Sequence, residues 1–190
     1  MAQNNLGLMY NNGKGVPRDY VKAARWFRRA AIQGYAWAQN NLGEMYKNGM
    51  GVPQDDAEAV RWYRLAVKQA YALAQNNLGE MYHWGKGVPR DDVEAVRLYR
   101  LAAEQEHAPA QYGLGLMYGL GDGVPQDYVM AHMWSNLARA RGYEEADELL
   151  ELLETQLSYK QIATAQTMAR PMPCARLQGL RQTVIRLFSI

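Results

Sequence analysis

The sequence predicts an all-α solenoid, in which short helix pairs stack along one axis. The first observation behind this prediction is a motif, Gln-Asn-Asn-Leu-Gly or its weaker fourth copy Gln-Tyr-Gly-Leu-Gly, which returns every 36 residues at Gln3, Gln39, Gln75 and Gln111. The second is Gly-x-Gly-Val-Pro-x-Asp, which recurs in phase at Gly13, Gly49, Gly85 and Gly121. In-phase repeats of this length are typical of solenoids, whose units bury their apolar faces only against their neighbours.

The first helix of each unit is clearest over residues 36–48. Leu42, Met45 and Tyr46 lie at i, i+3 and i+4 and share one face of this helix. Gly43 lies among them although a mid-helix glycine costs about 1 kcal/mol. Its recurrence at Gly7, Gly79 and Gly115 therefore predicts a close contact between helices. Gly49 follows the helix, where glycine can adopt the left-handed conformation that ends it.

The second helix of each unit follows the Val-Pro segment. Asp55 with Glu58, and Asp91 with Glu94, have the spacing of a capping box. Behind each cap runs an apolar stripe, which is Ala23, Trp26, Phe27, Ala30 and Ala31 in the first unit and is copied at steps of 36. The fourth copy has Ser135 at the second aromatic position. These stripes predict helices whose small residues admit a close neighbour.

The combined pattern resembles the Sel-1-like repeat family, a relative of the tetratricopeptide repeats. In the first unit it is carried by Leu6, Gly7, Tyr10, Gly13, Gly15, Val16, Asp19, Ala23, Trp26, Ala30, Ala31 and Gly34. The resemblance covers residues 1–142 and implies a right-handed α/α solenoid that binds other proteins. Ala70 and Glu106 replace the closing glycine in the middle units. If that position needs a positive φ, each replacement is strained by about 1 kcal/mol.

Two capping helices are expected over residues 143–170. The first, over 143–157, is acidic and amphipathic, with an inner face formed by Ala146, Leu149, Leu150, Leu153 and Leu157. Ser158 and Gln161 form a further capping box, and the helix that they open runs to about Arg170, before Pro171. This ending is similar to the last helix of many bacterial members of the family.

Residues 171–190 form a basic amphipathic tail. They carry Arg176, Arg181 and Arg186 and no acid, while one helical face would hold Leu177, Leu180, Val184 and Phe188. Such a tail can dock on the acidic residues of the 143–157 helix, on a partner with an acidic surface or weakly on an anionic membrane, or it can be a loose end without a role.

Composition argues against several functional classes. The net charge of +2 does not indicate a nucleic-acid partner, and the single cysteine, Cys174, permits no internal disulfide. No residues have the spacing of a catalytic, cofactor or metal site, so we expect neither an enzyme nor a cofactor. We expect no membrane span and a cytoplasmic location for the sequence as it stands. The sequence begins inside a helix, so we expect a fragment, and a lost upstream signal peptide would instead make the protein periplasmic or secreted.

The candidate binding residues lie on the face of each first helix that points away from its core. Steps of 100° from Leu42 place Asn40, Glu44 and Lys47 there. The equivalents are Asn76, Glu80 and His83, then Tyr112, Leu116 and Gly119. In related stacks this face lines a concave groove. The sequence therefore predicts that another protein or an extended peptide binds there.

Amides at the edge of this face offer a way to hold a peptide. Asn5, Asn41 and Asn77 resemble the tetratricopeptide asparagine that bonds a peptide backbone, although they can equally bond the adjacent helix. Trp84 is either a contact residue or fills a local gap.

The second helices carry arginines at a step of 36 on their outer face: Arg25, Arg61, Arg97 and Arg28, Arg64, Arg100. A solvated face, offset by Glu58 and Glu94, and a site for an acidic partner are both compatible with them. The function predicted overall is a non-catalytic protein- or peptide-binding scaffold. The alternative is an RNA-binding helical repeat, against which the near-neutral charge and Glu44 and Glu80 argue.

Overall fold

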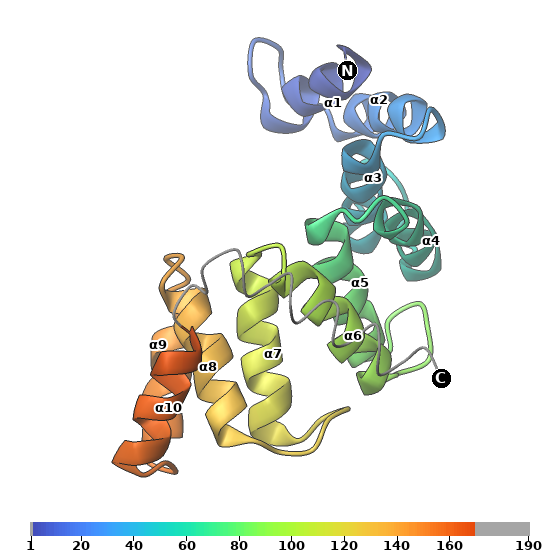
Figure 1. The fold of residues 1–190 in the computed structure, drawn as a ribbon. Coiled ribbons are helices and arrows are strands. Elements are labelled where there is room, and N and C mark those ends of the chain that lie inside the picture. The colour runs from blue at the N-terminus through green and yellow to red at the C-terminus, as the bar shows by residue number, and fades with distance from the viewer. Residues whose placement is uncertain (1, 170–190) are drawn as a thin grey trace.

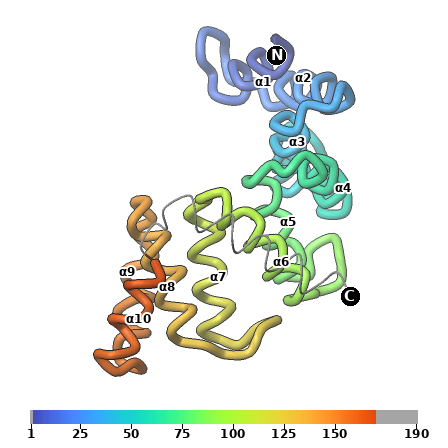
Figure 2. The backbone as a smooth tube through the Cα atoms, in the orientation of Figure 1, coloured from blue at the N-terminus to red at the C-terminus, as the bar shows by residue number. Residues whose placement is uncertain are grey.

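The computed structural model describes residues 2–169, which form ten helices and no strand. They are α1 (Ala2–Asn12), α2 (Tyr20–Ile32), α3 (Ala36–Asn48), α4 (Asp56–Val67), α5 (Ala72–Trp84), α6 (Asp92–Ala103), α7 (Ala108–Leu120), α8 (Tyr128–Arg139), α9 (Glu145–Glu154) and α10 (Tyr159–Ala169). Each helix from α1 to α8 packs on the next, and α9 and α10 both pack on α8. Four units, α1–α2 to α7–α8, and the two terminal helices α9 and α10, which we call the final pair, thus form one curved stack (Figure 1). The predicted all-α solenoid is confirmed, and the tube in Figure 2 shows its path from the first unit to the final pair.

At the recurring mid-helix glycine a side chain of the second helix of the unit lies directly against the first helix. A Cβ atom placed on Gly43 would lie 2.6 Å from the ring of Tyr63, and one on Gly7 would lie 2.6 Å from the ring of Phe27. A Cβ atom on Gly79 would lie 2.9 Å from the ring of Tyr99. The close helix contact predicted from the glycines is confirmed, because an aromatic ring of the second helix lies flush against the first.

The Gly-x-Gly turns join one unit to the one before it. The first glycine ends the helix in the left-handed conformation, as predicted, with φ of 66° at Gly49. The second glycine has a role that the sequence did not reveal. A Cβ on Gly87 would lie 2.3 Å from the carbonyl oxygen of Asp56, which begins the second helix of the preceding unit. Gly51 meets Tyr20 and Gly123 meets Asp92 in the same way.

The second helices begin at the predicted aspartates. The side chain of Asp55 accepts a hydrogen bond from the Glu58 amide at 2.9 Å, and Asp91 accepts one from the Glu94 amide at 3.0 Å. The other half of a capping box, in which the glutamate side chain accepts from the aspartate amide, is not formed, so this part of the prediction is wrong. The amides of Asp55 and Asp91 instead donate to carbonyl oxygens of the preceding helix. The two glutamates pair with Arg61 and Arg97, at 2.9 and 2.7 Å.

The closing position of each unit does require a left-handed backbone. Gly34 and Gly142 have φ of 90° and 79°, while Ala70 and Glu106 at the equivalent positions have φ of 57° and 65°. The predicted condition for strain is therefore met at both non-glycine residues.

The final pair, α9 and α10, lies where two helices were expected beyond the repeats. Ala146, Leu150 and Leu153 of α9 are buried, and Leu149 and Leu157 are half-buried. Ser158 and Gln161 meet before α10, where the Gln161 side chain accepts from both the Ser158 amide and its hydroxyl. The predicted end at Arg170 and the predicted tail, 171–190, lie outside the described residues.

Candidate functional site

The predicted binding residues form one row along α3, α5 and α7, which we call the helix-A face. It consists of Asn40, Asn41, Glu44, Lys47, Asn76, Asn77, Glu80, His83, Tyr112, Leu116 and Gly119. Figure 1 shows α3, α5 and α7, the first helices of the second, third and fourth units, and the residues of the row change from polar on α3 and α5 to largely apolar on α7.

Several asparagines of this row are covered by the neighbouring unit. Asn40 is fully buried, and Asn76 and Asn77 expose only 4% and 6% of their surface. The Asn77 amide nitrogen donates to the Asn40 side-chain oxygen at 3.0 Å, and the Asn76 amide donates to Glu80 at 2.9 Å. The solvent-facing placement expected for Asn40 and Asn76 is therefore wrong, because both side chains are buried and Asn40 meets Asn77 of the next unit. For Asn77, the alternative of a bond to the adjacent helix is the one observed.

Asn5 and Asn41 remain nearer the surface. Asn5 is exposed and Asn41 is half-buried. The amide nitrogens of Asn40 and Asn41 have no hydrogen-bond partner among residues 2–169. A buried donor left unpaired costs about 1–3 kcal/mol, which an acceptor relieves at Asn41 only if the side chain turns toward the surface.

The charges of the helix-A face are predominantly acidic on α3 and α5. Lys47 Nζ lies 2.9 Å from Glu80 and links the two helices. Glu44 is half-buried, and burial, opposed by Lys47 and aided by Glu80, raises the pKa of its carboxyl. Burial and these same two glutamates also raise the pKa of Tyr63, whose hydroxyl has no partner among the described residues. The carboxyl groups of Glu44 and Glu80 are thus both offset by the single charge of Lys47.

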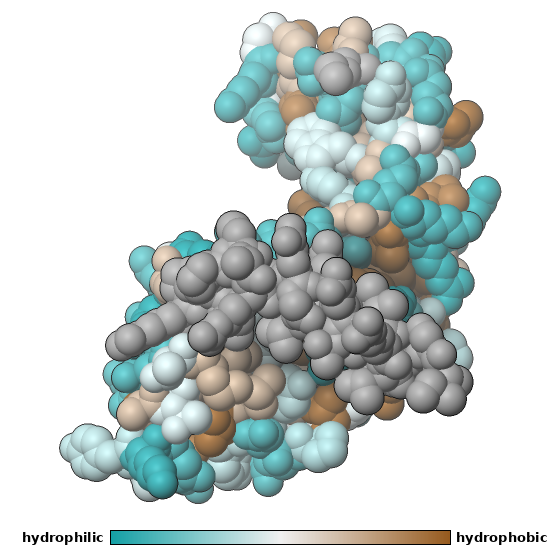
Figure 3. Space-filling model, in the orientation of Figure 1, coloured by the Kyte–Doolittle hydropathy of each residue, from teal (hydrophilic) through white to brown (hydrophobic). Residues whose placement is uncertain are grey.

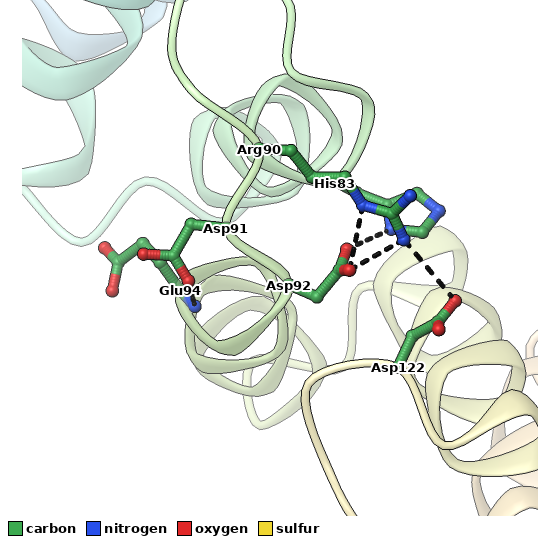
Figure 4. A network of polar contacts seen from close by, with 6 residues as sticks. All are labelled: His83, Arg90, Asp91, Asp92, Glu94 and Asp122. Carbon is green, nitrogen blue, oxygen red and sulfur yellow. Dashed lines mark hydrogen bonds and ion pairs between the residues drawn. The ribbon is translucent and has the colours of Figure 1, made fainter.

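His83 belongs to a polar network that lies at the junction between the third and fourth units. Its Nδ1 lies 2.7 Å from Asp92, which also accepts from Arg90 Nε at 2.9 Å (Figure 4). Arg90 reaches Asp122 of the next turn at 3.9 Å. Burial opposes ionisation of Asp92, but the hydrogen bonds from Arg90 and His83 outweigh it and lower the pKa of Asp92. His83 is therefore engaged within the protein, whereas Trp84 beside it is 67% exposed.

Tyr112 lies at the other end of the row. Its ring packs at 5.2 Å on that of Tyr143, just before α9. Burial raises the pKa of both hydroxyls, and Glu145 raises them further.

An apolar groove of about 430 Å³ opens where the helix-A face meets the final pair. It is lined by Leu116, Gly119, Leu120, Gln126, Tyr128, Leu149, Leu152, Leu153 and Gln156. Leu120 and Leu152 are 66% and 62% exposed. Figure 3 shows hydrophobic residues among hydrophilic ones over the part of the stack that α7 to α10 build. The sequence-based reasoning missed this groove.

No group of three or more His, Cys, Asp or Glu side chains in residues 2–169 is arranged to hold a metal ion. None of the helices described is long and apolar enough to cross a membrane.

A family model described as Sel1 repeat matches four segments of the chain, residues 1–35, 38–71, 72–107 and 108–143. The chain belongs to the Sel1 repeat family. Proteins of this family are generally scaffolds for protein interaction, and the fold is generally non-catalytic. None of the curated proteins matches the chain.

Two solved structures resemble this Sel1 repeat chain. One is c5321, a protective antigen present in uropathogenic Escherichia coli strains that displays an SLR fold, with 37% identity and a TM-score of 0.78 over 88% of this chain. The other is a Sel1 repeat protein from Oxalobacter formigenes, with 38% identity and a TM-score of 0.71 over 78% of this chain. The chain spans 37% and 61% of the length of these two proteins.

The arginines of the Sel1 repeats divide into two sets. Arg28, Arg64 and Arg100 each donate to a tyrosine hydroxyl of the next unit: Tyr46, Tyr82 and Tyr118. In the other set, Arg61 and Arg97 pair with Glu58 and Glu94, which confirms the predicted offset. One set therefore joins the units, and the recurrence of Arg and Tyr 18 residues apart is a signal that could have revealed it.

Proposed function

We propose that this Sel1 repeat chain binds an extended peptide segment of basic character along the helix-A face of α3 and α5. The observation that carries the proposal is the shared lysine. Glu44 and Glu80 lie on adjacent helices and Lys47 alone offsets them, so a cation from a ligand would find a carboxyl only partly neutralised.

Two further features fit an extended ligand. The Asn41 amide nitrogen is an unpaired donor on a half-buried side chain, and a peptide carbonyl is the acceptor that it gains if the side chain turns outward. Trp84, at the end of α5, offers an exposed aromatic surface of the kind that anchors protein interfaces. The tetratricopeptide-like architecture supports a groove along the first helices, where we place the ligand.

The test is selection of a displayed peptide library on the full chain, followed by calorimetry with the peptides obtained. We expect enrichment of lysine and arginine. The double variant Glu44→Gln, Glu80→Gln should weaken binding about tenfold or more, because a hydrogen bond to a charged group contributes about 1.5–3 kcal/mol.

A matched control removes the same two charges from the outer face. Glu58→Gln with Glu94→Gln should leave affinity unchanged, since both residues pair only with arginines of their own helix. Enrichment of acidic peptides, or equal losses in the two double variants, would contradict the proposal.

A further inference from the structure

The apolar groove is open because the final pair lacks the turn that covers the same place in the inner units. Gly87 and Gly123 of those turns lie on the backbone of Asp56 and Asp92. Tyr128 is the equivalent residue of the fourth unit. After α9, residues 155–158 lead directly into α10 without a Gly-x-Gly-Val-Pro segment, so Tyr128 lines the groove instead.

The polarity of the groove also differs from that of the junction between the third and fourth units. At that junction Asp92 forms an ion pair with Arg90 and a hydrogen bond with His83 (Figure 4). Their equivalents in the fourth unit are Gly119, Gln126 and Tyr128. Leu120 and Leu152, which are both exposed, line the walls of the groove. The occupant must therefore present apolar side chains.

We propose that residues 171–190 of the same chain dock in this groove. This segment has Leu177, Leu180, Val184 and Phe188 on one face if it is helical, and these match the leucine-rich walls. It carries three arginines and no acid. The wall formed by α9 belongs to a stretch, 143–157, with six acids and no base: Glu144, Glu145, Asp147, Glu148, Glu151 and Glu154. The apolar residues match at the groove itself, and the tail arginines are opposite in charge to acids of α9 beside it, of which Asp147 and Glu154 also contact Arg139 and His132.

The connection is long enough for the tail to reach the groove. Gln156 lines the groove just before α10, whose 11 residues carry the chain about 16 Å away from it. The eight steps from Ala169 to Leu177 span about 26 Å when extended, so they cover the return. Pro171 and Pro173 disfavour continuation of α10. A tethered segment also acts at a millimolar effective concentration, which favours it over a free partner.

Limited trypsin digestion of the full chain tests the proposal, because trypsin cuts after the three tail arginines. We follow cleavage after Arg176, Arg181 and Arg186 by intact mass. The double variant Leu120→Gln, Leu152→Gln should speed it at least about tenfold, since burial of one Leu or Phe side chain contributes about 1.5–3 kcal/mol. Both leucines are exposed, so the fold should tolerate the change. Val93→Gln, at a residue also 67% exposed but on α6, is the control and should change nothing.

Three outcomes would overturn docking in cis. They are equal cleavage rates in parent and double variant, protection that rises with chain concentration and so indicates a second copy, and protection that needs an added partner. A nitroxide on Cys174, the single cysteine, gives an independent measurement. It should broaden the methyl signals of Leu116 and Leu152 and leave those of Leu6 sharp; broadening of neither leucine, or broadening only between separately labelled chains, would also refute it. This proposal and its test do not depend on ligand binding by α3 and α5.

Discussion

The first three units and the C-terminal end of the stack use equivalent positions differently. Between the inner units an arginine of the second helix donates to a tyrosine of the next unit, as Arg64 does to Tyr82 at 2.8 Å. At the last junction Asn136 and Glu154 stand at those positions, and His132 lies between them, 2.8 Å from Asn136 and 3.4 Å from Glu154. A fully buried imidazole thus replaces an exposed guanidinium.

The ring beneath the mid-helix glycine changes in the same way. Phe27, Tyr63 and Tyr99 fill this place in the first three units. In the fourth, Ser135 lies under Gly115, and Leu149 of α9 comes within 3.5 Å of the Cβ position. The contrast teaches that the inner junctions share one set of contacts, whereas the end is completed by residues that occur once.

The largest difference we expect concerns the second turn glycine. Gly87→Ala should destabilise the fold by about 3 kcal/mol or more, because a Cβ would overlap the backbone of Asp56 as well as strain a residue with φ of 68°. Gly15→Ala is the matched control, since φ is 76° but only the flexible end of Met9 lies near, at 3.4 Å. It should cost about 1 kcal/mol. Thermal unfolding of both variants measures this, and equal costs would mean that the contact between units is unimportant.

A smaller difference concerns the glutamine pair inside each unit. Gln33, Gln69 and Gln105 donate to Gln3, Gln39 and Gln75 at 2.7–3.0 Å. In the fourth unit Arg141 stands in place of the donor, and the buried Gln111 side-chain oxygen has no partner among the described residues. Arg141 instead pairs at 2.7 Å with Glu106, whose side chain is 74% exposed.

Arg141→Gln should therefore stabilise the fold by about 1 kcal/mol. An unpaired buried acceptor costs about 1–3 kcal/mol, whereas an exposed ion pair contributes about 0–1 kcal/mol. The reverse change, Gln105→Arg, should destabilise the third unit by a similar amount, because it removes the hydrogen bond that Gln105 donates to the Gln75 side-chain oxygen. Chemical denaturation of the two variants gives both values. A loss of stability in Arg141→Gln would show that the ion pair to Glu106 is the stronger interaction.

The period of 36 residues made most of the fold predictable. The main signals recurred in phase, so the bounds of α3 followed from comparison between units, and the same comparison singled out Ala70 and Glu106 as the places where a left-handed backbone would be strained. The end of the stack offered no such repetition. The groove depends on a turn that the final pair lacks, and Leu149 fills space left by Ser135 through a contact that no periodic pattern encodes.

The candidate site was predictable only in part. A helical wheel places Asn40 opposite Leu42 but treats the helix as isolated, so it could not show that α5 covers Asn40. The same wheel grouped Glu44 with Lys47, yet Lys47 pairs with Glu80 of the next unit. Exposure and pairing on this face depend on the distance between neighbouring units, which the sequence of one helix does not contain.

The smallest expected effect compares Glu44 with Leu116, its equivalent in the fourth unit. Burial raises the pKa of Glu44, which Lys47 opposes and Glu80 supports, so the folded state binds the proton more tightly than the unfolded state. The ionised carboxyl therefore lowers stability, and the penalty develops as the pH rises from the ordinary value of 4.5 through the raised pKa of the folded state. Leu116 carries no such penalty.

Glu44→Gln should accordingly raise the thermal midpoint at pH 7 by roughly 1–2 °C, at the scale of about 0.5 kcal/mol typical of half-exposed substitutions. The difference from the parent should disappear near pH 3.5, well below the ordinary pKa, where Glu44 is protonated in both states. Glu58→Gln, on the outer face, serves as the control and should show no gain at pH 7, since Glu58 pairs with Arg61. A lower midpoint for Glu44→Gln at pH 7 would mean that Lys47 compensates the burial. A higher midpoint would show that Glu44 destabilises the inner units. Residues kept for binding often lower stability in this way.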